Sequence, residues 1–208
     1  MKIVFDFDGV ICYSQVEMLR RLSNKLGRLI TVDDWKIYNM NKNFDAETVK
    51  ALKPIFTEDV YNEAEVDAFD ENIGECMRIA HEKGHDVSIE TICDSETTYR
   101  HKQNYIQGKG LGFADMQPVY SFDKQIKADI VVEDCYENLE KADANIKILI
   151  TRPWNKNFNA DITVDETVEI PHESLCVGSD NSDTLVKKIH YIRVNDTQEL
   201  KRLFEELL

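Results

Sequence analysis

The chain of 208 residues is poor in basic side chains and has no long hydrophobic run. Its 25 Lys and Arg residues are outnumbered by 39 Asp and Glu residues, which gives a formal net charge of −14. This charge argues against nucleic-acid polymers as partners, because their binding depends on basic groups that neutralise phosphates. No run approaches the ~20 apolar residues of a membrane span, and Met1 leads directly into an apolar segment without a signal-peptide pattern. These absences predict a cytoplasmic protein that does not enter a membrane.

Paired cysteine spacing is absent as well. The five cysteines are scattered without a C-x-x-C motif, which argues against both a disulfide framework and a structural zinc site. Buried cysteine behaves as a small hydrophobic residue, so we expect that role, rather than redox control, for Cys12, Cys93 and Cys135. The length allows one domain of ordinary size with a modest insertion.

What the chain does have is an N-terminal hydrophobic segment that ends in two aspartates. Residues 3–5 form an apolar run of the kind found in buried parallel strands. Asp6 and Asp8 follow it two positions apart, so their side chains share one face while the chain stays extended, and Gly9 then permits a turn. Ligands of open α/β sheets gather at such strand ends. The alternative interpretation is a simple strand-ending turn, in which Asp is common.

Two adjacent carboxylates repel each other unless a cation lies between them. Mg²⁺ is the expected cation, because it prefers hard oxygen ligands and commonly takes one or two carboxylates together with a substrate phosphate. One carboxylate can attack phosphorus, and the other can donate a proton to the departing oxygen and later accept one from water. The pattern therefore predicts phosphoryl transfer with a Mg²⁺ cofactor.

The segment DFDGV after a hydrophobic strand resembles the first motif of the haloacid dehalogenase-like phosphatases. The resemblance implies that Asp6 is the nucleophile and a metal ligand. It implies that Asp8 is the general acid and base, with its backbone carbonyl also on Mg²⁺. Strands alternate with helices along the rest of the chain, which predicts an α/β fold: a Rossmann-like parallel sheet with helices on both faces.

Later strand ends follow the order of the family's other motifs. Thr91 ends the strand pattern DVSIET, where the second motif places a hydroxyl that binds the transferring phosphoryl oxygen. Lys124 is the favoured third-motif lysine, and Lys127 is the alternative. By itself, a strand-end threonine or a single lysine usually has no function, so the argument depends on the order of the motifs.

The fourth motif of the resemblance is an acidic pair after the hydrophobic residues 130–132. It implies Asp134 as a metal ligand and Glu133 as a second acid that acts through water. The family often has Asp at the position of Glu133, so the longer side chain could move the ion. A basic cluster at residues 99–102 is interpreted as a solvated helix face and is left out of the site.

The segment after the first motif is predicted to be helical. Helices are expected over residues 16–26, 45–52 and 57–69, the first of them after a capping box that begins at Ser14. In the family, an insertion at this place is a cap that closes over the site and selects the substrate. We therefore expect a core domain of residues 1–13 and 71–208 and a helical cap of residues 14–70.

A narrower resemblance rests on TRPWN at residues 151–155 and EDCYENLE at residues 133–140. These segments are similar to the cytosolic-type 5′(3′)-deoxyribonucleotidases. The similarity implies a small phosphorylated substrate, with a nucleoside monophosphate favoured. Trp35 could stack on a base, although core packing is the commoner role of such a tryptophan.

Two other functions stay open on the sequence alone. The first is a phosphatase acting on 3′-phosphorylated nucleic-acid ends or sugar phosphates. The second is a non-catalytic protein that binds phosphate or serves assembly. Residues 159–188 depart from the family pattern, with a strand-like alternation in DITVDETVEI, and they could form a hairpin, a lid or a homodimer contact.

Overall fold

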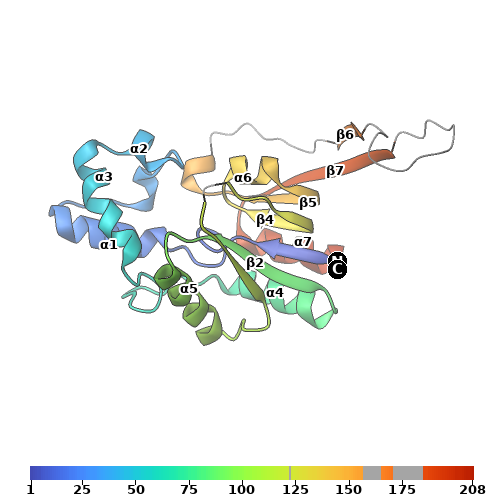
Figure 1. The fold of residues 1–208 in the computed structure, drawn as a ribbon, viewed down its shortest axis with the longest axis horizontal. Helices are drawn as coiled ribbons and strands as arrows, with labels where there is room; N and C mark the ends of the chain where they lie inside the picture. Colours follow the sequence, from blue (N-terminus) through green and yellow to red (C-terminus); the bar gives the residue numbers. More distant parts are fainter. Residues whose placement is uncertain (122, 157–164, 171–184) are drawn as a thin grey trace.

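The computed structural model describes residues 1–121, 123–156, 165–170 and 185–208. One seven-stranded sheet has the strand order β3-β2-β1-β4-β5-β7-β6 (Figure 1). The strands are β1 (Lys2–Phe5), β2 (Asp86–Ile92), β3 (Asp115–Val119), β4 (Lys127–Glu133), β5 (Asp143–Ile150), β6 (Asp165–Ile170) and β7 (Leu185–Val194). All neighbouring pairs are parallel except β6 with β7. The predicted α/β class with a parallel sheet is confirmed.

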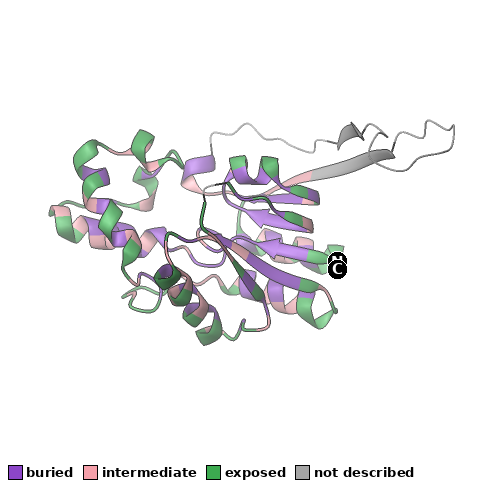
Figure 2. Cartoon of the chain, viewed as in Figure 1, coloured by how far each residue is buried: buried purple, intermediate pink, exposed green. Residues whose placement is uncertain are grey.

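Helices surround this sheet. They are α1 (Gln15–Leu26), α2 (Met40–Asn43), α3 (Ala46–Leu52), α4 (Glu71–Glu82), α5 (Glu96–Gly108), α6 (Tyr136–Lys141) and α7 (Thr197–Leu207), with 3-10 turns at Val32–Asp34, Lys53–Thr57 and Pro153–Asn155. Side chains alternate across a strand, and β1 shows the result. Ile3 and Phe5 join the larger core with residues of α4, α5 and α7, while Val4 joins a smaller core with residues of α6. Figure 2 shows the buried sheet between exposed helix faces.

Residues 14–70, all of which the structure describes, contain helices and turns but no strand. Helices α1 to α3 gather beyond the carboxyl end of β1 (Figure 1). Leu52, Ile55 and Tyr61 of this segment belong to the larger core cluster. The segment is therefore packed against the sheet domain at the end where the sequence predicts the site.

The prediction of a helix over residues 57–69 is wrong. Only the 3-10 turn Lys53–Thr57 is present, and turns follow it. The Asp59 carboxylate accepts hydrogen bonds from the backbone N–H groups of Tyr61 at 3.1 Å and Asn62 at 2.8 Å. Arg21 donates to the carbonyl of Asp59 at 2.9 Å. These side chains satisfy backbone groups that a helix would otherwise use, which favours a turn.

Strand β3 at Asp115–Val119 is an edge strand, where Pro118 is tolerated. One local expectation also needs correction. The capping box at Ser14 does not form, because the Ser14 hydroxyl donates to Asp8 instead. Within residues 159–188, the last six residues of the strand-like alternation, 165–170, form β6. Residues 159–164 and 171–184 lie outside the described residues.

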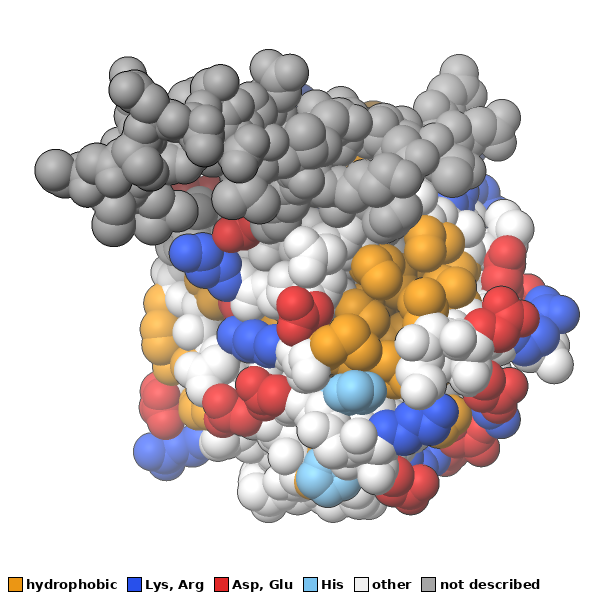
Figure 3. Space-filling view, turned by 90° about the vertical axis from the view of Figure 1, so that its right-hand side faces the viewer, with side chains coloured by type: hydrophobic (Ala, Val, Ile, Leu, Met, Phe, Trp, Pro, Cys, Tyr) orange, Lys and Arg blue, Asp and Glu red, His pale blue; other side chains and the backbone are white. Residues whose placement is uncertain are grey.

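The face that carries the chain termini shows hydrophobic side chains gathered beside histidines, with acidic and basic groups around them (Figure 3). The negative charge of the chain is therefore interspersed with positive charge on this face. Among the described residues, no helix is both long and apolar enough to cross a membrane.

Candidate active site

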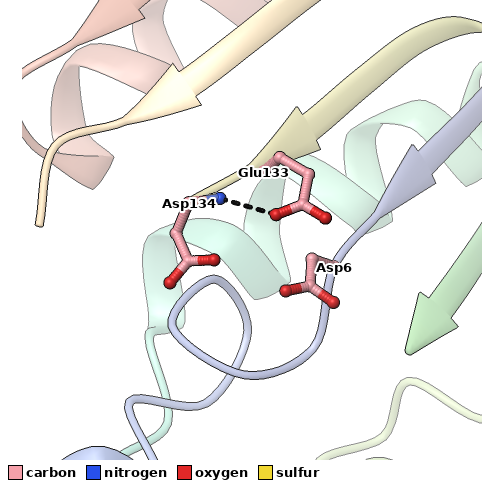
Figure 4. Close-up of side chains that lie close together, drawn as sticks. All are labelled: Asp6, Glu133 and Asp134. Atoms are coloured by element: carbon pink, nitrogen blue, oxygen red, sulfur yellow. Dashed lines mark hydrogen bonds between the residues drawn. The ribbon is translucent and has the colours of Figure 1, made fainter. Parts of the chain in front are cut away.

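Three buried carboxylates meet where β1 and β4 end side by side. Asp6 follows β1, Glu133 is the last residue of β4, and Asp134 comes directly after it (Figure 4). The two strands are in register, and the Asp6 N–H donates to the Val132 carbonyl at 2.9 Å. One carboxylate oxygen from each of the three acids lies within 4.8 Å of the others. Parallel pairing thus brings together acids that are separated by more than half of the chain.

Lys124 joins two of these acids. Its Nζ donates to Asp6 Oδ1 at 2.7 Å and to Glu133 Oε1 at 2.8 Å, and its side chain is buried. Burial alone would lower the pKa of Lys124, but the Asp6 and Glu133 carboxylates outweigh it and raise the pKa above the usual value. The other predicted lysine, Lys127, begins β4 and is exposed. Of the two candidate lysines, Lys124 is therefore the one that contacts Asp6.

Every position around the Glu133 carboxylate is occupied by a donor. Oε1 accepts from Lys124 and from Asn138 Nδ2 at 3.0 Å, and Oε2 accepts from the backbone N–H groups of Asp134 and Cys135, both at 3.0 Å. An ionised carboxylate offers about four acceptor sites. Glu133 therefore acts as the anchor of Lys124 rather than as an oxygen available to a cation.

Asp134 has the opposite environment. Both carboxylate oxygens are buried, and no described residue donates a hydrogen bond to either. Burial, together with the Asp6 and Glu133 carboxylates, raises the pKa of Asp134 well above its usual range. Burial and Glu133 likewise raise the pKa of Asp6 to about 7, against the lowering effect of Lys124. A cluster of buried carboxylates with unpartnered oxygens fits a divalent cation such as Mg²⁺.

Gly9 is required where the chain passes Asp134. It has a φ of +81°, and a Cβ at this position would lie 2.0 Å from Asp134 Oδ2. Both the left-handed conformation and the close approach exclude a larger residue. The glycine of the first motif therefore makes room for the carboxylate of the fourth.

The Asp8 carboxylate lies outside this cluster and is held by other residues. Oδ1 accepts from Ser14 Oγ at 2.6 Å and from the Tyr61 hydroxyl at 3.1 Å, and Oδ2 accepts from Lys102 Nζ. Lys102 Nζ also donates to Thr91 Oγ1 at 2.7 Å. The structure thus links Asp8 to Thr91 through Lys102, and a contribution of Asp8 to a metal would come from its backbone carbonyl.

The sequence interpretation missed Lys102 by assigning residues 99–102 to a solvated face. Arg100 is indeed exposed, but Lys102 is buried together with Thr98, Tyr105 and Ile106 of α5. The i, i+4 and i+7 spacing from Thr98 to Tyr105 would have placed Lys102 on the inner face. That spacing was the available signal.

The TRPWN segment, residues 151–155, donates hydrogen bonds to the backbone of the loops that carry the site. Asn155 is buried, and its Nδ2 donates to the carbonyls of Asp134 and Ile150, both at 2.8 Å. Arg152 Nε donates to the Gly9 carbonyl at 2.6 Å. These residues fix the loops that carry the first and fourth motifs.

Trp35 is not placed to stack on a substrate base. It is 7% exposed, and its ring packs against Phe44 and Trp154. The core role, which the sequence analysis gave as the commoner one, is the role observed.

Comparison with known proteins supports the fold. No protein-family model matches the chain, and no curated protein matches it in sequence. Among solved structures, a haloacid dehalogenase-like family hydrolase from Streptococcus pneumoniae is similar, with a TM-score of 0.52 and 12% sequence identity. The match covers 98% of this chain and 97% of that one. The described part of the chain therefore has a fold similar to that of this hydrolase.

Proposed function

We propose that the protein is a Mg²⁺-dependent phosphomonoesterase that acts through an aspartyl-phosphate on Asp6. The observation that carries the proposal is the contrast around Asp6. On one side, Lys124 Nζ donates to Asp6 Oδ1 at 2.7 Å. On the other side lies the buried carboxylate of Asp134, to which no described residue donates a hydrogen bond. This arrangement suits a nucleophile placed between a fixed positive charge and a cation site.

In this reaction the Asp6 carboxylate attacks phosphorus in line, and the ester P–O bond breaks as the O–P bond to Asp6 forms. Asp8 acts in its protonated form, with the proton on the site of Oδ2 that the bond from Lys102 leaves open, and it donates this proton to the departing oxygen. Asp8 then accepts a proton from water, which attacks phosphorus, releases inorganic phosphate and regenerates Asp6. Lys124 and the Thr91 hydroxyl provide positive charge and a hydrogen bond to the transferring oxygens.

Mg²⁺ bound by Asp6, Asp134 and the backbone carbonyl of Asp8 would neutralise charge on the phosphoryl group. Lys124 counteracts the raised pKa of Asp6 and thereby favours the ionised form that attack requires. Asn138 and Asn155 hold the residues around it through Glu133 and the Asp134 carbonyl. In this proposal, the chain's own residues position the nucleophile and its neighbours.

For the substrate we favour a nucleoside monophosphate, on the resemblance of TRPWN and EDCYENLE. Residues 14–70 serve as the cap in this proposal, and Tyr61 of that segment reaches Asp8. The predicted cytoplasmic location and the absence of a nucleic-acid polymer as partner belong to the same proposal. A homodimer stays a prediction that oligomeric-state measurements test.

The test is a Mg²⁺-dependent phosphatase screen with the Asp6→Asn variant as control. The panel contains dUMP, a 3′-phosphorylated oligonucleotide and a hexose phosphate. We expect dUMP to be hydrolysed fastest and Asp6→Asn to lose activity by at least about 10³-fold, because it removes the attacking group. Circular dichroism should show an unchanged fold in the variant.

Each outcome decides between the functions left open by the sequence. Preference for the oligonucleotide or the hexose phosphate would replace the substrate assignment. Substantial residual turnover by Asp6→Asn would overturn the nucleophile assignment. Binding of phosphate without turnover of any panel member would favour the non-catalytic function.

A further inference from the structure

Lys102 is a buried charge to which the reaction above gives no role. Its side chain is 1% exposed, and burying an ammonium group costs free energy unless it is fully compensated. Nζ has three hydrogens, and three acceptors surround it: Asp8 Oδ2, Thr91 Oγ1 at 2.7 Å and the Ile92 carbonyl oxygen at 2.8 Å. Two of these three acceptors are proposed site residues.

Aromatic rings enclose the same ammonium group. Nζ lies 5.1 Å from the centre of the Phe7 ring and 5.7 Å from that of Tyr61, within the range of cation–π attraction. Tyr61 in turn donates its hydroxyl hydrogen to Asp8 Oδ1. Burial, with the neighbouring Asp8 carboxylate, raises the pKa of Tyr61 well above its usual range, so the hydroxyl keeps this hydrogen.

We propose that Lys102 is a positioning residue that holds the Asp8 carboxylate and the Thr91 hydroxyl in one fixed arrangement beside the nucleophile. This inference rests on the proposed phosphomonoesterase function. At Asp8, Lys102 binds Oδ2 while Ser14 and Tyr61 bind Oδ1, so rotation of the carboxylate would break a bond on either side.

The same bond orients Thr91. An ammonium group has no acceptor, so Thr91 Oγ1 must accept from Lys102. The hydroxyl hydrogen of Thr91 is then left to donate to a phosphoryl oxygen. One buried cation therefore aligns the group that protonates the leaving oxygen with a group that binds the phosphate.

The test compares Lys102→Met with Lys109→Met on two substrates. Lys109 is the matched control, since it caps the C-terminal end of α5, pairs with an acid, Asp67, and packs against two aromatic rings, but it contacts neither Asp8 nor Thr91. The substrates are dUMP and p-nitrophenyl phosphate. Nitrophenolate leaves without being protonated, whereas the alkoxide of dUMP needs the proton of Asp8.

We expect Lys102→Met to lower kcat for dUMP by about 100-fold, the order of a general acid's contribution, and kcat for p-nitrophenyl phosphate by much less. Lys109→Met should leave both values unchanged. Lys102→Arg keeps the charge but not the three bonds of Nζ. It should therefore also lose more kcat on dUMP than on p-nitrophenyl phosphate. This variant decides the matter if Lys102→Met does not fold.

Equal losses on both substrates would overturn the positioning of Asp8, because only dUMP needs its proton. A rise in KM with unchanged kcat would overturn the whole positioning role, because it would mark Lys102 as a direct substrate contact. The same losses in Lys109→Met would assign the effect to the helix as a whole. These results require an active wild-type enzyme and leave the proposed function standing. A wild-type protein that hydrolyses neither substrate refutes the proposed function and this inference with it.

Discussion

Replacing Asp134 by Asn removes a buried carboxylate that receives no hydrogen bond from any described residue. Both of its oxygens lack donors, and the Asp6 and Glu133 carboxylates lie next to it. The introduced amide has almost the same volume, carries no charge and can donate to a neighbouring carboxylate. In the absence of metal, the Asp134→Asn variant should therefore be more stable than the wild type.

The size of the gain follows from the cost of the carboxylate. An uncompensated ion in a protein interior costs several kcal/mol after relaxation. Protonation of Asp134 avoids part of that cost, since its pKa is raised well above the usual range. We expect a gain of about 2–4 kcal/mol near neutral pH, which raises Tm by roughly 5–15 °C in a chain of this size.

Thermal unfolding near neutral pH, first in EDTA and then with increasing Mg²⁺, measures both halves of the prediction. Mg²⁺ should raise the Tm of the wild type, because a ligand that binds only the folded state stabilises it, and it should leave the Tm of Asp134→Asn unchanged. Asp86→Asn is the control, because Asp86 is exposed at the start of β2. A lower Tm of Asp134→Asn in EDTA, or a persistent Mg²⁺ response, would refute the reasoning.

Two further predictions concern the same cluster. Gly9→Ala should abolish the Mg²⁺-dependent rise in Tm, because the new Cβ displaces the Asp134 carboxylate. The control Gly84→Ala has a similar φ of +80° but no atom within 4 Å of a Cβ, so it should keep the rise. Equal behaviour of the two variants would contradict the close approach of Gly9 to Asp134. In EDTA, the stability contributed by Asp6 should be complete below its unfolded pKa of 3.8 and lost as pH rises toward the folded value of about 7, a change of about 4 kcal/mol. Urea unfolding of wild type and Asp6→Asn at several pH values measures it, and the variant should gain relative stability as pH rises; a constant difference would show that the pKa of Asp6 is not raised.

The sheet and the first and fourth motifs could be predicted from the sequence because their signals are local. Residues 3–5 and 130–132 are short hydrophobic runs that end in acids. Since parallel strands present their carboxyl ends at one edge, two such runs predict one site without any knowledge of the loops. Pairing of β1 with β4 then brings Asp6 beside Asp134.

The support of Asp8 could not be predicted in the same way. Ser14, Tyr61 and Lys102 contact it from three separate segments, and each pattern has a commoner local meaning. Ser14 has the signature of a helix cap, and Lys102 belongs to a basic cluster. The partner that decides their roles, one carboxylate, becomes visible only after long-range packing.

Glu133 is where the chain departs from the family pattern, and its geometry accounts for the longer side chain. One additional methylene lets Oε2 turn back to the N–H groups of Asp134 and Cys135 while Oε1 reaches Lys124 and Asn138. The neighbouring Asp134, which is shorter, receives no hydrogen bond from the described residues. The two adjacent acids therefore have opposite environments. In the proposed function, Glu133 would hold Lys124 and Asp134 would hold the cation, which is the division that a nucleophile at Asp6 would require.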